Sequence, residues 1–432
     1  MSRRFECIIV GAGPAGVTAA LVLARAGVEV LVIERGQSPG SKNMFGGAFY
    51  GKGFSEVVPD VWEEAPIERP ITRWALSFIT PGTCCSLDLK SAYLHDRPPH
   101  VYTVLRSKFD SWYANKAVEA GVRMLTETLV EDVLWEQGRV VGIMAGRDQG
   151  ELCADVVIAA DGVNSLLAQK AGLRKDLTPL DALLGVKEIL ELPRETIDQV
   201  FCLPAGEGMA HTFIGAATPG VEGGGFIYTN RESLSVGFVA RLSSLTEQQV
   251  RPEEVLEGFT HHPMIRPLLK DAVFREYAAH LIPESSPVTN RQLYTDGLLL
   301  VGDAAGLVLS TGLRHEGAHY AILSGIAAAE TVKYAREKRD FSGARLKAYH
   351  GFLEKAGVIA DFKQFRHAPR FFRNKRLYQA YPELVCAFAE ALVRGEPHAK
   401  PGFWSVAKES AKGKVTWHEF LKDALDAWRT FG

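Results

Sequence analysis

Three glycines near the amino terminus have a spacing that suits contact with a dinucleotide. The apolar run 5–10 leads directly into Gly11, Gly13 and Gly16. In this arrangement the first glycine allows a tight turn, the second lets the backbone approach a pyrophosphate, and the third lets a helix pack closely on a strand. A helix that begins near Pro14 would direct the positive end of its dipole at the phosphates. The pattern predicts a strand, a phosphate-binding turn and a helix, in that order.

An acidic residue follows this turn at a distance typical of ribose binding. Glu34 stands eighteen residues after Gly16, at the end of a second apolar run, 28–33. Its carboxylate could accept hydrogen bonds from ribose hydroxyls and would repel a 2′-phosphate. A glycine-rich turn without a ligand is the alternative. The complete order of strand, glycine turn, helix, strand and acid favours dinucleotide binding over that alternative.

Two further motifs lie far from the first in the sequence. Asp161 and Gly162 follow one short apolar run, and Gly302 and Asp303 follow another, 297–301. Each motif alone could be an ordinary turn at the end of a strand, because Asp and Gly are common there. In this order and spacing, the three motifs resemble the FAD-binding pattern of glutathione-reductase-type, p-hydroxybenzoate-hydroxylase-like flavoproteins.

The resemblance implies that FAD is the cofactor and that Asp303 bonds its ribityl chain. It also implies that the next helix begins beneath the flavin ring, where the helix dipole would favour the negative charge of reduced flavin. Arg106 opens a predicted helix at a position where this class often contacts FAD, and a surface arginine is the alternative. The expected cofactor-binding residues are Gly11, Gly13, Pro14, Ala15, Gly16, Glu34, Arg35, Asn43, Gly46, Gly47, Arg106, Val130, Asp161, Gly162, Gly302, Asp303, Gly312 and Leu313.

Over roughly residues 5–385 the chain resembles the FixC and electron-transfer-flavoprotein:quinone oxidoreductase family. The segments that carry this resemblance are 41–47 (SKNMFGG), 102–110 (YTVLRSKFD), 185–188 (GVKE), 223–230 (GGGFIYTN) and 381–384 (YPEL). Aromatic-ring hydroxylases of the same fold usually have a histidine where this chain has Gly306, followed by a proline-containing turn that is absent before Gly312. The Trp-x-Trp motif of flavin halogenases is absent too. Geranylgeranyl reductases usually have an aromatic-rich signature in place of 226–230, and they are the second alternative.

The cysteines bear on which partners the resemblance implies. The six cysteines are scattered without a CxxC pair, so we expect reduced thiols and no metal site. Only Cys386 follows Cys202, too few for a four-cysteine iron–sulfur cluster in the second half. The family resemblance implies electrons from a bifurcating electron-transfer flavoprotein, through a separate small ferredoxin-like protein or directly, to FAD and then to a quinone. A non-enzymatic FAD-bound scaffold in a larger complex is a third alternative.

Quinone reduction consumes protons, and candidate groups follow the Asp303 motif. His315 and His319 are four residues apart and would share a helix face if one helix spans both. An unperturbed histidine titrates near neutrality, which suits proton delivery. Arg314 could stabilise charge near the flavin. The alternative is that the two histidines are surface or capping residues.

One basic and aromatic segment could contact a membrane or a partner. Residues 362–378 contain six Lys or Arg, four Phe and no acidic residue. This mixture suits an anionic membrane surface or an acidic ferredoxin, and a surface helix with a solvated basic face is the alternative. A net charge of −2 gives no reason to expect nucleic-acid binding. With no room for a signal peptide and no membrane-spanning run, we expect a cytoplasmic protein, peripheral on the inner face of the cell membrane.

The elements that position these motifs predict an α/β protein. We expect a Rossmann-like FAD-binding domain of the p-hydroxybenzoate-hydroxylase type, an inserted antiparallel α+β substrate domain, and a helical C-terminal region. The expected ranges are 1–80, 100–172 and 285–335 for the FAD domain, 81–99 and 173–284 for the substrate or quinone domain, and 336–432 for the helical region. Residues 40–53 are too glycine-rich for a regular element and predict a loop. The spacing of apolar residues predicts a helix over 106–120, and from about 317 the chain is expected to be helical.

Overall fold

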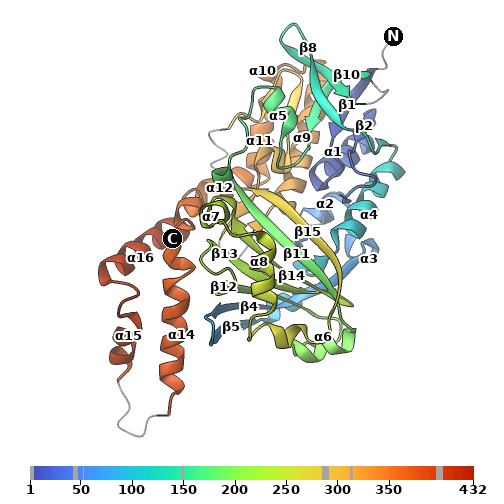
Figure 1. The fold of residues 1–432 in the computed structure, drawn as a ribbon. Coiled ribbons are helices and arrows are strands. Elements are labelled where there is room, and N and C mark those ends of the chain that lie inside the picture. The colour runs from blue at the N-terminus through green and yellow to red at the C-terminus, as the bar shows by residue number, and fades with distance from the viewer. Residues whose placement is uncertain are drawn as a thin grey trace. The chain divides into compact units, whose positions relative to one another are not determined.

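The computed structural model describes residues 4–41, 47–51, 53–146, 150–284, 291–311, 315–395 and 402–432. The chain forms two compact units (Figure 1), and neither is continuous in sequence. The first unit comprises Met1–Ile67, Val104–Asp181 and Leu281–Arg366, and the second comprises Glu68–Thr103, Ala182–His280 and His367–Gly432.

A mainly parallel sheet lies at the centre of the first unit. Its strand order is β16-β17-β10-β1-β2-β7, with β8 and β9 attached beyond β10. Only the pairs that involve β8, β9 and β16 are antiparallel, among the described residues. The strands are β1 Arg4–Val10, β2 Val30–Ile33, β7 Arg123–Leu125, β8 Val130–Glu136, β9 Arg139–Ala145, β10 Gly150–Ala159, β16 Tyr294–Thr295 and β17 Leu298–Leu300. The parallel pairs bring the carboxyl ends of β1, β2, β10 and β17 to one edge.

The first unit also contains helices. They are α1 Pro14–Arg25, α2 Phe54–Val57, α3 Val61–Glu64, α4 Arg106–Glu119, α5 Leu166–Lys170, α9 Ala318–Glu337, α10 Gly343–Leu346, α11 Ala348–Lys355 and α12 Val358–Gln364. Helices α1 and α9 pack closely, since a Cβ built on Gly325 would lie 2.5 Å from the carbonyl oxygen of Ala15. The helices predicted over 106–120 and from about 317 are confirmed as α4 and α9. The prediction of a structureless loop over 40–53 is wrong in one place, because Ala48–Tyr50 forms the short strand β3.

A larger sheet fills the second unit. Its order is β15-β11-β14-β13-β12-β4-β6, with β5 paired to β4. The strands are β4 Ile67–Ile79, β5 Cys84–Lys90, β6 Val101–Val104, β11 Ala182–Glu191, β12 Gly208–Gly215, β13 Gly223–Thr229, β14 Ser233–Arg241 and β15 Val273–Pro283. The expected antiparallel pairing holds from β11 to β12. It fails at β12 and β4, which pair in parallel, because β4 comes from a distant part of the chain and no hairpin joins the two.

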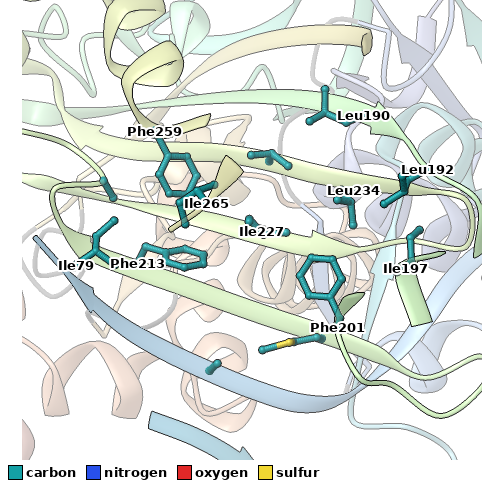
Figure 2. Close-up of a cluster of buried hydrophobic side chains, with 14 of the residues drawn as sticks. Ile79, Leu190, Leu192, Ile197, Phe201, Phe213, Ile227, Leu234, Phe259 and Ile265 are labelled. Atoms are coloured by element: carbon teal, nitrogen blue, oxygen red, sulfur yellow. The ribbon is translucent and has the colours of Figure 1, made fainter. Parts of the chain in front are cut away.

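One face of this sheet carries the core of the second unit. Figure 2 shows Phe213, Ile227, Leu234 and Phe259 among the clustered side chains, and the rings of Phe213 and Phe259 lie 5.4 Å apart. Helices α6 Arg194–Val200, α7 Leu242–Gln248 and α8 Pro252–Thr260 accompany the sheet. Aromatic and aliphatic side chains contributed by strands and helix thus bury one sheet face.

Four further helices complete the second unit: α13 Ala368–Phe371, α14 Ala380–Val393, α15 Phe403–Ala411 and α16 Trp417–Phe431. Helix α14 contacts β5 and β12, and it also contacts α15 (Figure 1). Among the described residues, no helix is both long enough and apolar enough to span a membrane.

Candidate functional site

The three motifs that lie far apart in sequence meet at one edge of the sheet in the first unit. Backbone hydrogen bonds join the ends of its strands: Gly11 N–H donates to Ile33 O (2.8 Å) and Ala160 N–H donates to Val10 O (2.8 Å). Val301 N–H donates to Ala159 O (3.0 Å) in the same way. In parallel α/β sheets this edge is where nucleotide ligands bind.

The fingerprint glycines differ in what surrounds them. A Cβ built on Gly11, whose φ is +105°, would lie 2.2 Å from the carbonyl oxygen of Ala160, and one on Gly16 would lie 2.0 Å from that of Gly11. A Cβ on Gly13 would meet nothing within 4 Å. Gly11 and Gly16 are therefore required by the protein's own packing, whereas Gly13 leaves open space next to the first turn of α1. That space lies where a phosphate would approach the backbone.

The first turn of α1 is suited to binding an anion. Gly13 is its N-cap, no side chain caps the helix, and Pro14 occupies the first helical position. Pro14, Ala15 and Gly16 are all buried, and none of them has a polar side chain. The uncapped N–H groups and the helix dipole together favour negative charge there.

Glu34 lies beside this turn and retains capacity to accept hydrogen bonds. Its Oε2 accepts from Ala12 N–H (2.9 Å) and its Oε1 accepts from Gly36 N–H (2.7 Å). A carboxylate has about four acceptor positions, so two are left for hydroxyl groups. Arg35, the next residue, is exposed.

Val130 lies close to Glu34 through the backbone. The segment before it is joined to the Glu34 turn, because Glu127 N–H donates to Gly36 O (2.9 Å) and Thr128 N–H donates to Glu34 O (3.0 Å). Val130 itself is buried and opens β8. The structure therefore brings this predicted cofactor residue to the same end of the site as Glu34.

The Asp161 motif links two parts of the site. Asp161 Oδ2 accepts from Leu167 N–H (2.9 Å) at the start of α5, and Ser165 Oγ donates to Ala304 O (2.9 Å) beside the Asp303 motif. Within the described residues, Asp161 Oδ1 is buried and has no hydrogen-bond partner. Burial raises the pKa of Asp161, whereas the bond from Leu167 lowers it. Gly162 has a φ of +77° and open space at its Cβ position.

Asp303 lies in the short 3₁₀ turn Gly302–Ala305. A Cβ built on Gly302 would lie 3.0 Å from the Cβ of Ala15, so this turn rests against the start of α1. Burial raises the pKa of Asp303 to about 6, although the positive charge of Arg106 opposes the increase. The carboxyl group is thus charged or neutral depending on small changes around neutral pH.

Arg106 is buried at the first position of α4, which excludes the surface alternative. Its guanidinium donates two hydrogen bonds to Asp110, from Nε to Oδ1 (2.8 Å) and from Nη2 to Oδ2 (2.7 Å). It also lies over the ring of Phe49, 5.6 Å from the ring centre. Burial lowers the pKa of Arg106, but the charges of Asp110 and Asp303 outweigh it and raise that pKa. Sequence reasoning missed the role of Asp110, although its spacing of four residues from Arg106 on a helix could have indicated the pair.

The predicted proton donors do not share a helix. His315 is in the two-residue strand β19 (His315–Glu316), paired with β18 (Leu309–Ser310), whereas His319 is in the first turn of α9. The condition for a shared face is not met, because the helix begins only at Ala318. The atoms around His315 lower its pKa to about 4 by desolvation, although its side chain keeps contact with solvent and with it part of its hydration.

The remaining predicted residues are placed as follows. Gly47 is buried and its carbonyl oxygen accepts from Val104 N–H (2.9 Å). Asn43, Gly46, Gly312, Leu313 and Arg314 lie outside the described residues.

Comparison with known proteins decides the family. Residues 4–313 match the model of the FAD binding domain family. Protein FixC of Salmonella typhi is 42% identical over 421 residues, covering 98% of this chain and 97% of that protein. Protein FixC of Azotobacter vinelandii is 38% identical and covers 99% of both. The Escherichia coli (strain K12) protein named "Probable electron transfer flavoprotein-quinone oxidoreductase YdiS" is 40% identical, covering 95% of this chain and 98% of that protein.

The chain belongs to the FixC and electron-transfer-flavoprotein–quinone oxidoreductase family. It is accordingly an FAD-dependent oxidoreductase. A geranylgeranyl bacteriochlorophyll reductase-like protein of Thermoplasma acidophilum shares the fold, with a TM-score of 0.75 at 20% identity, covering 98% of this chain and 99% of that one. The flavin-dependent brominase Bmp2 has a TM-score of 0.66 at 16% identity, covering 98% of this chain and 97% of that one. The predicted p-hydroxybenzoate-hydroxylase-like fold is confirmed.

The described residues fit an FAD at this edge of the sheet. Gly13 leaves the space that a pyrophosphate needs, and Glu34 has acceptor capacity left for a ribose. Asp303 and Arg106 add a carboxyl and a guanidinium that interact electrostatically near the start of α1. Bound FAD supplies the redox chemistry, because its ring takes up and releases electrons singly or in pairs.

Proposed function

We propose that this chain is the FAD-carrying dehydrogenase subunit that takes electrons from an electron-transfer flavoprotein and passes them to a membrane quinone. The observation that carries the proposal is identity of about 40% over nearly the whole chain to proteins that include an electron transfer flavoprotein-quinone oxidoreductase by name. The likeness to the reductase-like protein of Thermoplasma acidophilum is a likeness of fold alone, so the isoprenoid reductase alternative has less support.

In this proposal the chain's own residues hold the cofactor in a fixed order. The backbone at Gly13 and the first turn of α1 receive the pyrophosphate, and Glu34 accepts from the ribose hydroxyls of the adenosine part. Asp303 accepts from the ribityl hydroxyls. Arg106, held by Asp110, keeps a positive charge near Asp303 that favours its ionised, accepting form.

His315 and His319 are the candidates for proton supply to the quinone. Desolvation lowers the pKa of His315, which favours its neutral form, although its side chain keeps contact with solvent. His319 lies in the first turn of α9. Arg314 keeps its proposed role of stabilising charge.

We further propose that the electron-transfer flavoprotein is a bifurcating one and that a separate ferredoxin-like protein carries the iron–sulfur cluster. The six cysteines support this. All are free thiols, and the described residues contain no group of three or more His, Cys, Asp or Glu that could hold a metal ion. A cluster on the electron path would then need ligands from another chain.

We also propose that the protein works in the cytoplasm, peripherally at the inner face of the membrane, where a quinone is accessible. In the basic and aromatic segment 362–378, the phenylalanine side chains pack against other parts of the protein. Phe362 is buried and packs on Tyr320 (5.2 Å between ring centres), and Phe371 and Phe372 pack on Phe431 (5.5 and 6.1 Å). The segment therefore offers basic side chains to solvent while its aromatic side chains are engaged. The expected domain ranges remain a proposal as well.

The test is an anaerobic reconstitution. The FAD-loaded chain is mixed with its host's electron-transfer flavoprotein and ferredoxin-like protein, and reduction of a soluble quinone analogue is followed by absorbance. We expect reduction only when the partners are present. Full activity of the chain alone with NADPH would contradict the proposal. Saturation of a prenyl chain by the chemically reduced protein would favour the reductase, and a flavin that no quinone reoxidises with all partners present would favour the scaffold.

A further inference from the structure

Helix α16 is attached to the second unit by its polar face. Asp423 and Thr430 are buried, with 5% and 2% of their surface exposed. Arg376 donates two hydrogen bonds to Asp423, from Nη2 to Oδ1 (2.6 Å) and from Nε to Oδ2 (2.7 Å). The Tyr381 hydroxyl donates a third to Asp423 Oδ2 (2.8 Å). Burial raises the pKa of Asp423, but these bonds outweigh it and hold that pKa below its usual range. An ion pair on the polar face therefore fastens this helix, and at its end Phe431 packs on Phe371 and Phe372.

The apolar stripe of α16 faces the opposite way, into solvent. Trp417, Leu421, Leu425 and Trp428 are 71%, 63%, 52% and 74% exposed. Their spacing is that of one side of a helix, on which Phe420 also lies at 45% exposure. A surface helix normally turns such a stripe inward, and contiguous exposed apolar surface of this kind marks an interaction site.

The neighbouring helices carry exposed apolar side chains as well. At the start of α15, Phe403 and Trp404 are 57% and 76% exposed, and at the end of α14, Leu392 and Val393 are 54% and 85% exposed. Phe403 also packs against Phe388 of α14, with ring centres 5.2 Å apart, which holds α15 beside α14. Three of the chain's seven tryptophans thus lie exposed on α15 and α16.

The charged side chains around this surface have a small positive excess. Lys408 and Lys422 are exposed on α15 and α16. Lys412 and Arg429 are exposed too, and they pair with Glu409 (3.4 Å) and Asp426 (3.7 Å). Two of the acidic residues of α16, Asp423 and Glu419, form ion pairs with Arg376. Over residues 367–432 there are eleven Lys or Arg and seven Asp or Glu, whereas the whole chain has a net charge of −2. This part of the chain therefore has a net positive charge, although the chain as a whole is slightly negative.

The exposed apolar side chains and the nearby lysines together indicate what this surface binds. Tryptophan rings with aliphatic side chains on one helix face, flanked by lysines, are the composition of helices that lie in the interface of an anionic bilayer. A second copy of this surface would bring positive charge against positive charge, which opposes self-association. Negatively charged lipid headgroups are complementary to it, and the stripe supplies the apolar area that an interfacial helix buries among acyl chains.

We propose that the exposed face of α15 and α16, defined by Trp404, Trp417, Leu421, Leu425 and Trp428, docks on the surface of an anionic membrane. This inference deepens the proposed quinone-linked function, because it places an FAD protein where a quinone dissolves, but its evidence lies in these helices alone. Binding is peripheral: the tryptophans lie at headgroup depth while the Arg376–Asp423 pair keeps α16 attached to its own unit.

The experiment is co-sedimentation of the FAD-loaded full chain with vesicles. One set is neutral phosphatidylcholine, and the other contains about one-third phosphatidylglycerol. We expect binding to the anionic vesicles, a blue shift of tryptophan fluorescence, and weaker binding at high salt. The triple variant W417S/L421S/W428S should bind about tenfold more weakly. The matched control is Trp135→Ser, which removes an exposed tryptophan of β8 in the other unit and should leave binding unchanged.

Bound flavin and the melting temperature show that both variants fold. Equal binding of the triple variant and the native chain would overturn the proposal, and so would absence of binding to either vesicle type. A native chain that is a dimer in solution, and that the triple variant makes monomeric, would show instead that the face joins two copies. Because the assay contains no quinone and no electron-transfer flavoprotein, its failure leaves the proposed function untouched, and failure of quinone reduction leaves this inference untouched.

Discussion

Helices α1 and α16 bury opposite kinds of residue. In α1 the apolar residues are inside, with Val17 1% exposed and Leu21 fully buried, and its open space is at the Gly13 end, where backbone groups face a ligand. In α16 the acidic residue Asp423 is inside and Trp417 is outside. The first helix is held by the hydrophobic effect, and the second is held by an ion pair together with the packing of Phe431 on Phe371 and Phe372. The comparison shows two ways in which a helix can offer a binding surface: α1 offers the backbone at its first turn, and α16 offers the side chains of one face.

The largest effect is expected at Gly11. Gly11→Ala places a methyl group 2.2 Å from the carbonyl oxygen of Ala160, at a φ of +105° that alanine rarely adopts. Removing this clash requires moving β1 or β10, so we expect a loss of about 4 kcal/mol in unfolding free energy. Denaturant unfolding followed by circular dichroism measures the loss. Native stability in this variant would show that α1 depends less on its glycine turn than the geometry indicates.

The ion pair of α16 is the next target. Arg376→Met leaves Asp423 buried without its partner, which typically costs about 3 kcal/mol. Hydrogen exchange of residues 417–431 should become faster while exchange in α1 stays unchanged. Arg370→Met removes an exposed arginine of the same segment and serves as the control. If exchange in α16 does not change, an apolar contact rather than the ion pair holds this helix.

Gly13→Ala separates cofactor binding from folding. Its methyl group meets no protein atom within 4 Å, so we expect the protein without cofactor to lose no more than about 1 kcal/mol of stability, since alanine is a poorer N-cap than glycine. The same methyl occupies the space of the pyrophosphate, and affinity for FAD should fall about a hundredfold, or roughly 2.7 kcal/mol. Equilibrium dialysis with FAD measures the change. Unchanged affinity would place the phosphates elsewhere than at the start of α1.

The smallest effect concerns the pH dependence due to Asp303. Its pKa is raised to about 6 in the folded protein, above roughly 3.9 in the unfolded chain. The folded state then binds more protons between these values, so stability falls as the pH rises through this window, by about 2 kcal/mol. Asp303→Asn should flatten this slope in protein freed of FAD, as measured by denaturant unfolding from pH 4 to pH 7. A slope that persists in the variant would assign the titration to another group.

The sequence predicted those features that are determined by residues close to one another in the chain. The strand β1, the turn at Gly11 and the helix α1 follow one another in the chain, and their spacing predicted them because each glycine answers a constraint from its neighbours. The shared helix face of His315 and His319 was not present, because Leu309–Ser310 pairs with His315–Glu316 and α9 begins only at Ala318. No periodicity of four residues could reveal that competing pairing.

By itself the sequence determined the cofactor, the fold class and the family. A glycine fingerprint, an acid and two strand-end motifs are recognisable one by one, and their order is preserved in the chain. Only the tertiary structure decided that Arg106 is buried on Asp110, that β12 pairs in parallel with β4, and that α16 turns its tryptophans outward. The reason is physical: an amphipathic sequence specifies that a helix has two different faces, and only the rest of the fold decides which of them is covered.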